Sequence, residues 1–572
     1  MGDWMDPYFI NALLEHWHSS VWRLRDPTSP PMFFPSPHTL GYSHALVLYA
    51  PFYLPIRLFV HPFLAHTLTI FAVIEVGIVC LYLVLRRFAG ASFVEAAVLS
   101  AFFLTSANVA GLATSIWSQR ASVFLIPPIV QMALVSRQPG PARSRLTLAF
   151  VSGLSATLLF AHDFYTAQLA LLFVLLIVAG ALVERRRVIA EAIRGFWRRA
   201  RPRERAAVAA AALLAAWSVY VWHWGGGTVE ILGLAVRSHN WRKPTAFAVV
   251  SLGAFVWMRR DGLSFPRRTL VTPWADAFAT GAVVGAIVFL WIYLAAYVEH
   301  RTFPEEHLLN ALVARDLDGL SSPLKFLTGL SAYETSRPFL LVLTAAILGW
   351  LPWCAIDRTA RLLLLGLVLV SAIVLVAPLR FEGFSFWRTF IEPLPGFGII
   401  RDPKRIIYLY ELFVALAIGI LLARSSRHPW YRASVVGVLV ALLIAFPNRQ
   451  VFTYARPIAV YDRWVSAPVA IDPSCQSFFT RAASAEYTSR SSDMWSLYSI
   501  DSLFVALTRA IPTLNGYSAW SPGGWDLMNP TDADYQERVR QWIERHRLEG
   551  VCELDLDART MTPAALNTHR QR

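Results

Sequence analysis

The sequence predicts an all-α polytopic membrane protein with about twelve transmembrane helices and a small C-terminal extracytoplasmic α/β domain. Three observations support this prediction. Of the 572 residues, 56% are hydrophobic, and the mean hydropathy is +0.46. The apolar residues form long runs such as 171–183 and 277–298, and about 20 apolar residues span the hydrocarbon core as a helix. The 21 Trp and 19 Tyr residues suit aromatic belts at membrane interfaces.

Hydropathy divides residues 62–446 into spanning segments joined by short loops. The predicted segments are 62–84, 93–111, 121–136, 146–160, 166–183, 206–222, 244–258, 275–298, 338–354, 361–377, 406–423 and 433–446.

The loops between these segments alternate in charge. One set, which includes 86–90 and 184–205, is rich in Arg, whereas the other, which includes 112–120, is poor in it. The positive-inside rule places the first set in the cytoplasm, and residues 1–61 and 447–572 outside. We therefore interpret the net charge of +14 as an orientation signal and expect no nucleic-acid partner.

Residues 1–61 are predicted to form the first outer loop. Apolar residues recur at helical spacing over 5–25. Five prolines exclude a helix over 26–40, and a second amphipathic stretch follows at 41–59. Two such helices are expected to lie flat on the outer membrane surface. Because the loop precedes the first predicted span, we expect a first spanning helix to be missing from this sequence.

Residues 447–572 change in character, since the apolar runs shorten and polar residues become more frequent. The pattern predicts a surface helix over 533–550, ending at its glycine, and a strand over 551–557. Cys475 and Cys552 lie in this part. They either pair as a disulfide in an oxidising compartment or remain two buried thiols.

Candidate acids lie in two outer segments. The opening stretch GDWMDPYF contains Asp3 and Asp6. A helix N-cap explains Asp6 and a disordered terminus explains Asp3, whereas the functional alternative is a general base towards an acceptor hydroxyl. His162 and Asp163 lie at a turn between two apolar runs, where ionisable residues are either functional or simply in contact with interfacial water.

Candidate cations lie in two other outer segments. Arg401, Lys404 and Arg405 precede a predicted span on the side where positive charge is disfavoured. They either anchor the chain to anionic headgroups or bind a lipid phosphate. His239 and Arg242 carry the same two alternatives, with anchoring favoured.

An aromatic loop occupies residues 512–527 of the C-terminal part and contains Tyr517, Trp520 and Trp525. These rings either stack on a sugar or fill the core of the domain, and the second interpretation is favoured.

Three motifs indicate a family. GDWMDPYF (2–9), FFPSPHTLGYS (33–43) and GFGIIRDPKR (396–405), together with about a dozen spans, resemble a bacterial, mostly uncharacterised branch of the GT-C fold integral-membrane glycosyltransferases. The resemblance covers about residues 1–446.

This resemblance implies a multi-pass protein of the bacterial inner membrane with a periplasmic C-terminal domain. It implies a polyprenyl-phosphate-linked sugar as donor, and an envelope glycan or lipid as acceptor. By the same resemblance, Asp6 or else Asp3 is the catalytic base, Arg401 and Arg405 hold the lipid phosphate, and Asp163 substitutes for a second acid. A divalent metal stays open, and no other cofactor is expected.

Two other classes of protein remain alternatives. A lipid or sugar transporter or flippase predicts broken or charged helices at mid-membrane and an internal repeat, and the sequence shows no convincing repeat. A non-catalytic membrane scaffold would use the C-terminal domain to recruit an envelope partner.

Overall fold

A computed structural model defines the fold. It describes residues 5–105, 118–184, 191, 201–224, 227–231, 234–238, 273–302, 341–342, 345–346, 358–376, 380–381, 384–392, 406–425, 428–445, 470–481, 495–518, 520–530, 532–556 and 558–564.

The apolar segments form helices. The helices are α3 (Pro62–Val84), α4 (Phe93–Leu104), α5 (Ile126–Val135), α6 (Ala142–His162), α7 (Phe164–Glu184), α9 (Pro202–Trp224), α11 (Pro273–Thr302), α15 (Arg358–Val376), α16 (Ile406–Arg424) and α17 (Pro429–Ala445). The predicted segment 244–258 lies outside the described residues, as does nearly all of 338–354. The other predicted segments overlap these helices, but 121–136 begins in the 3₁₀ helix η4 (Ser118–Leu125), and residues 106–111 of the segment 93–111 are not described.

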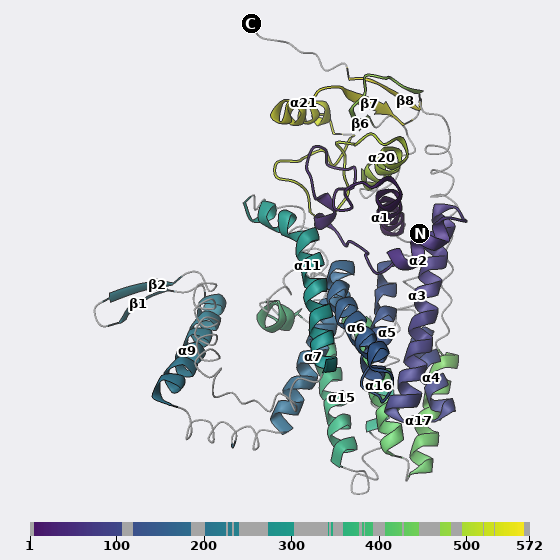
Figure 1. The fold of residues 1–572 in the computed structure, drawn as a ribbon, viewed down its shortest axis with the longest axis vertical. Coiled ribbons are helices and arrows are strands. Elements are labelled where there is room, and N and C mark those ends of the chain that lie inside the picture. The colour runs from purple at the N-terminus through teal and green to yellow at the C-terminus, as the bar shows by residue number, and fades with distance from the viewer. Residues whose placement is uncertain are drawn as a thin grey trace. The chain divides into compact units, whose positions relative to one another are not determined.

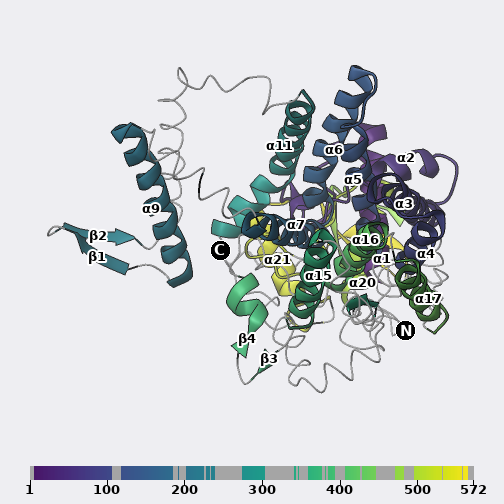
Figure 2. The ribbon, with the colours of Figure 1, turned by 90° about the horizontal axis from the view of Figure 1, so that it is seen from below.

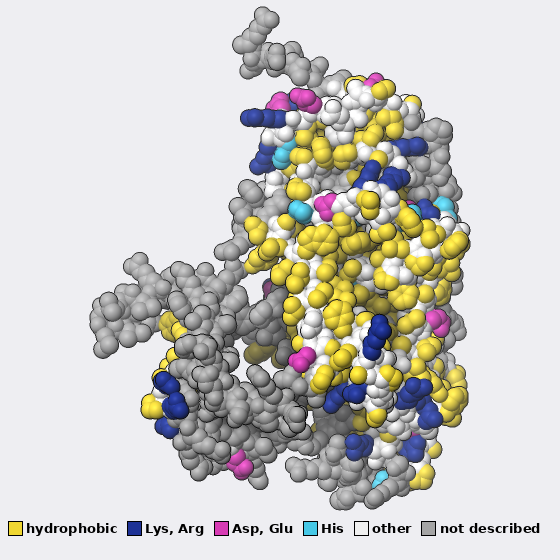
Figure 3. All heavy atoms as spheres, in the orientation of Figure 1, with side chains coloured by type: hydrophobic (Ala, Val, Ile, Leu, Met, Phe, Trp, Pro, Cys, Tyr) yellow, Lys and Arg dark blue, Asp and Glu magenta, His cyan; other side chains and the backbone are white. Residues whose placement is uncertain are grey.

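Three of the described helical stretches are long and apolar enough to cross a membrane: Pro62–Ala89, Ala142–His162 and Pro273–Val298. The first comprises α3 and the short π-helix η2 (Leu85–Ala89). The protein is therefore a mostly helical membrane protein, while the total of about twelve spans stays a prediction. Apolar side chains cover much of the surface of the described helices (Figure 3).

The chain forms two compact units. Unit 1 comprises Met1–Ala170, Ala277–Trp387 and Ile400–Arg572, and unit 2 comprises Leu171–Asp276 and Arg388–Ile399. Unit 2 contains α9 and the antiparallel pair β1 (Gly227–Ile231) and β2 (Leu234–Ser238). The short π-helix η5 (Trp387–Ile391) begins at the last residue of a unit 1 segment and continues in unit 2. The antiparallel pair β3 (Arg380–Phe381) and β4 (Phe384–Ser385) comes before η5 in the sequence. The division into 1–61, 62–446 and 447–572 stays a prediction.

In unit 1, helix α4 packs against α3, α16 and α17, and Figure 2 shows these helices side by side. Arg432 of α17 donates from Nε and Nη2 to the two carboxylate oxygens of Glu95 in α4, at 2.7 and 2.9 Å. Glu95 also completes a capping box with Ser92. This two-pronged ion pair fixes the register of the two helices.

The predicted first outer loop, residues 1–61, contains α1 (Met5–Arg23), the 3₁₀ turn η1 (Thr39–Tyr42) and α2 (Ala50–Arg57). The predicted helix over 5–25 is confirmed. The second helix is shorter than the predicted 41–59, because η1 and extended residues occupy the first part of that stretch. The apolar stripe of α1, which includes Tyr8, Leu13 and Leu14, is buried.

Helix α1 lies between the C-terminal domain and the membrane helices, as Figure 1 shows. One side contacts α20 (Trp495–Arg509), and the others contact α2, α3 and η4 (Ser118–Leu125). Glu15 of α1 accepts hydrogen bonds from the Tyr53 hydroxyl at 2.5 Å and from Arg57 Nε at 2.6 Å. The apolar face of α1 is therefore covered by protein.

The C-terminal part folds around a four-stranded sheet of order β5–β8–β7–β6. The strands are β5 (Ala470–Ile471), β6 (Ser477–Arg481), β7 (Val551–Asp555) and β8 (Thr560–Pro563), and α20 and α21 (Tyr535–His546) complete the domain. The predicted strand is β7. The predicted helix ends at His546, four residues early, because Arg547 adopts a left-handed conformation with φ 52°.

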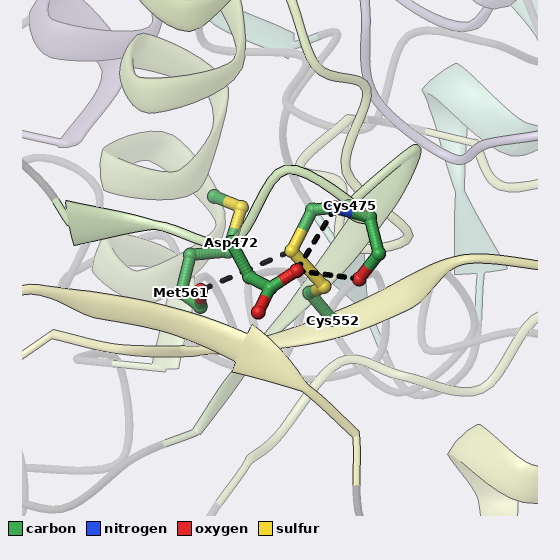
Figure 4. Close-up of a disulfide and its surroundings, with 5 residues drawn as sticks. Asp472, Cys475, Cys552 and Met561 are labelled. Atoms are coloured by element: carbon green, nitrogen blue, oxygen red, sulfur yellow. Dashed lines mark hydrogen bonds between the residues drawn. A yellow bond between two sulfur atoms is a disulfide. The ribbon is translucent and has the colours of Figure 1, made fainter.

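A disulfide joins Cys475 to Cys552, the pair that the sequence offers (Figure 4). Cys475 precedes β6 and Cys552 lies in β7, so the bond ties the segment before β6 to the neighbouring parallel strand β7. It closes a sequence separation of 77 residues. Loops of that length give about 4 kcal/mol of stabilisation in the chain-entropy model.

The backbones of helices α6 and α11 lie in direct contact at glycine residues. A Cβ atom at Gly281 of α11 would lie 2.0 Å from the Phe150 carbonyl oxygen of α6, and one at Gly153 would lie 2.0 Å from that of Phe278. Gly285 follows Gly281 at the four-residue spacing of small residues in tightly packed membrane helices. This contact sets where α11 stands against α6.

We expect Gly281→Ala to lower the free energy of unfolding by about 1–3 kcal/mol, because the added methyl group must push the two helices apart. Thermal unfolding in detergent micelles measures the loss. The matched control is Gly437→Ala in α17, where an added Cβ meets nothing within 4 Å and helix propensity favours alanine. Equal melting temperatures for the two variants would contradict the close contact.

Candidate functional site

Asp6 lies in the first turn of α1. Its carboxylate accepts hydrogen bonds from two distant segments. The Tyr517 hydroxyl donates to Oδ1 at 3.2 Å and Gln119 Nε2 donates to Oδ2 at 3.4 Å. The side chain therefore joins α1, η4 and the C-terminal domain within unit 1, which goes beyond the role of a helix start that the sequence leaves open.

The turn η4 holds Gln119 in place. Its backbone presses against α3 where that helix has Gly77, since a Cβ there would lie 2.4 Å from the Phe124 carbonyl oxygen. The Tyr49 hydroxyl donates to the Ser118 carbonyl at 3.0 Å. Gln119 itself is only 7% exposed. Because a carboxylate only accepts, the Gln119 amide must face Asp6 with its NH₂ group.

A small cavity begins beside Gln119. It is lined by Gln119, Arg120, Val123, Asp163, Tyr165, Thr166, Leu169 and Leu409. Arg120 is 6% exposed and Asp163 is 3% exposed. Two buried charged residues, Arg120 and Asp163, therefore line one cavity, and Gln119 links that cavity to Asp6.

Asp163 caps the N-terminus of α7. It has extended backbone angles. Its Oδ1 accepts from the Tyr165 backbone N–H at 3.1 Å and its Oδ2 from the Thr166 hydroxyl at 2.5 Å. His44 Nδ1 lies 3.6 Å from Oδ1. The sequence left interfacial hydration or function open for this residue, and the structure adds a capping role.

His162 is fully buried at the end of α6. Its Nδ1 accepts from the Leu48 backbone N–H at 3.2 Å, so a neutral ring carries its proton on Nε2. Tyr49 meets the ring edge to face at 4.2 Å between centroids. The imidazole therefore packs the first outer loop onto α6, and it does not line the cavity.

Tyr293 of α11 binds the backbone of residues 43–45 and the end of α6. Its hydroxyl accepts from the Ala45 backbone N–H at 3.1 Å, and the carbonyls of Ser43 and Ala161 both lie 2.9 Å from it. The turn that carries His162 and Asp163 is thereby tied to the first outer loop.

The structure describes some of the predicted site residues. Asp6, His162 and Asp163 lie in unit 1, where Asp6 and Asp163 are linked through η4. The predicted site residues Asp3, His239, Arg242, Arg401, Lys404 and Arg405 lie outside the described residues.

Sequence reasoning missed Gln119 and Arg120 and underrated Tyr517. Arg120 gives one usable signal, because it stands in a predicted outer loop that is otherwise poor in Arg. Gln119 gives none. In the aromatic loop, Trp525 is buried at 4% exposure, which agrees with the core interpretation, whereas Tyr517 reaches Asp6.

The described residues contain no group of three His, Cys, Asp or Glu side chains that could hold a metal ion. Asp6 has Gln119 and Tyr517 as neighbours, and Asp163 is engaged as a cap. These described residues do not form a metal centre.

The fold and site define a class: a mostly helical membrane protein with a buried charged site beneath a disulfide-linked domain. The chain matches no protein-family model, and no curated protein matches it in sequence. Among solved structures it is similar to the archaeal oligosaccharyltransferase AglB from Archaeoglobus fulgidus in complex with an inhibitory peptide and a dolichol-phosphate.

The identity to that protein is 9% and the TM-score 0.42, over 96% of this chain. The match spans 65% of the length of that protein. A TM-score of this size does not establish a common fold.

We expect Asp163→Asn and Asp163→Ala to differ in stability. Asparagine keeps an oxygen that accepts from Tyr165, whereas alanine removes the cap and costs about 1 kcal/mol, or about 1 °C in melting temperature. Thermal unfolding in micelles measures both variants. An equal loss in the two would show that the negative charge beside His44, and not the cap, stabilises the turn.

Proposed function

We propose that this protein is a membrane glycosyltransferase that moves a sugar from a polyprenyl-phosphate donor to an envelope glycan or lipid acceptor on the periplasmic face. The observation that carries the proposal is the environment of Asp6. Its carboxylate is held on both oxygens by neutral donors at the junction of α1, η4 and the C-terminal domain.

In this proposal Asp6 is the general base. Each carboxylate oxygen has two lone pairs and accepts one hydrogen bond here, so a lone pair remains on each for an acceptor hydroxyl. Asp6 removes the hydroxyl proton as the oxygen attacks C1 of the sugar. The new glycosidic bond forms, the bond from C1 to the phosphate oxygen breaks, and the lipid phosphate leaves with inversion at C1.

The leaving phosphate needs positive charge. Arg120 supplies a buried guanidinium one residue from Gln119, and Arg forks suit phosphate oxygens. Arg401 and Arg405 are proposed to complete this site, with Lys404 beside them, and Asp163 to stand as the second acid. Asp3, His162, His239 and Arg242 stay secondary candidates.

The proposed location is the bacterial inner membrane with the C-terminal domain in the periplasm. Loop charge supports this orientation. The Cys475–Cys552 disulfide supports it too, because such bonds persist in oxidising compartments. Membrane lipid surrounds the helices, and their exposed apolar side chains, such as Phe71 and Ile287, are suited to it.

We expect Asp6→Asn to lower transfer by about a hundredfold or more, because asparagine accepts hydrogen bonds but is not a base at neutral pH. The assay follows release of polyprenyl phosphate from a radiolabelled polyprenyl-phosphate hexose by the purified protein in lipid bilayers. The control is Asp26→Asn, a carboxylate of the same outer loop whose hydrogen bonds are to Thr28 and Ser29.

Full turnover by Asp6→Asn would refute Asp6 as the base. No release of polyprenyl phosphate by the folded wild-type protein, with any lipid-linked sugar offered, would refute the glycosyltransferase proposal as a whole.

A further inference from the structure

We propose that Tyr517 is a positioning residue, and that the C-terminal domain thereby completes the catalytic site by holding the carboxylate of Asp6. This inference rests on the proposed function, in which Asp6 is the base. It assigns the domain a part in the reaction, where the sequence left the role of the domain open.

The hydrogen bonds to Asp6 define the orientation of its carboxylate. The Tyr517 hydroxyl donates to Oδ1 and Gln119 Nε2 to Oδ2. One donor on each oxygen fixes the plane of the carboxylate and removes the rotation that a single donor would leave. Phe9 of α1 meets the Tyr517 ring edge to face at 5.0 Å. The Tyr517 side chain is therefore held at its ring by Phe9 and at its hydroxyl by Asp6.

The loop that carries Tyr517 is bound to the first outer loop on both sides of that residue. Before it, the Phe33 backbone N–H donates to the Asn515 carbonyl at 3.1 Å, and that of Thr513 donates to the Pro31 carbonyl at 3.0 Å. After it, the Ser518 hydroxyl donates to the Tyr42 carbonyl at 2.7 Å.

Close packing restrains the same loop. A Cβ atom at Gly516 would lie 2.2 Å from the ring of Phe33, so only glycine lets that ring lie against the backbone beside Tyr517. The rings of Trp525 and Phe33 also meet edge to face at 4.8 Å between centroids. Tyr517 therefore has little freedom to leave Asp6 while the domain is docked.

The loop offers a matched pair of variants. Tyr517→Phe keeps the ring, and with it the contact to Phe9, and removes only the hydroxyl that reaches Asp6. Ser518→Ala removes a docking hydrogen bond one residue away and leaves Asp6 untouched. A merely structural role would make the two variants alike, whereas a positioning role makes only the first affect Asp6.

The test uses the full chain in lipid bilayers and two readouts. The first is the rate at which a water-soluble carbodiimide and glycine ethyl ester modify Asp6, followed by mass spectrometry of the α1 peptide. The second is the rate of release of polyprenyl phosphate at saturating polyprenyl-phosphate hexose. We expect Tyr517→Phe to raise the modification rate and lower kcat, each by about tenfold, with KM unchanged, and Ser518→Ala to match wild type.

Equal modification of Asp6 in wild type and Tyr517→Phe would overturn the inference. So would equal losses of kcat in Tyr517→Phe and Ser518→Ala, since docking alone would then explain them. If wild type releases no polyprenyl phosphate, the proposed function fails, and the modification rates still decide whether Tyr517 holds Asp6.

Discussion

The hydrogen bond from the Tyr8 hydroxyl to the Asp501 carboxylate, at 2.6 Å, anchors the junction on which the site depends. Asp501 is 1% exposed, and a buried carboxylate is costly unless its hydrogen bonds are made. The Tyr8 ring also stacks on Phe504 at 4.8 Å. An apolar contact alone would allow α1 to slide along α20, whereas the Tyr8–Asp501 hydrogen bond forms at only one relative position of the two helices. At that position Asp6 lies within hydrogen-bonding distance of Tyr517.

The membrane helices fix the other half of the site through small residues and buried tyrosines. Gly77 lets η4 press against α3, and the Tyr49 hydroxyl ties η4 to the first outer loop. Tyr293 binds that loop to the end of α6. Burial raises the pKa of the Tyr49 phenol, so it stays a hydrogen-bond donor throughout the physiological range. The polar side chains of the site thus rest on rigid neighbours.

The helices were predictable from the sequence, because periodicity and apolar run length are local properties. The helices over 62–84, 406–423 and 5–25 needed no tertiary information. The surroundings of Asp6 were not predictable. Its partners lie 113 and 511 residues away in sequence, and no local pattern distinguishes Gln119 or Tyr517 from other polar or aromatic residues. The sequence predicted a helix that ends at Gly550, whereas α21 ends at His546 because Arg547 adopts the left-handed conformation.

The disulfide connects redox chemistry to the position of Asp6. It joins Cys475, which precedes β6, to Cys552 in β7. In β6, the Phe478 carbonyl accepts from the Leu514 backbone N–H at 2.7 Å, which sets the path of the loop that ends at Tyr517. A continuous series of contacts therefore connects the Cys475–Cys552 disulfide to the carboxylate of Asp6. An oxidising compartment stabilises the bond, so the side of the membrane that the loop charges predict is also the side on which this support for Asp6 is strongest.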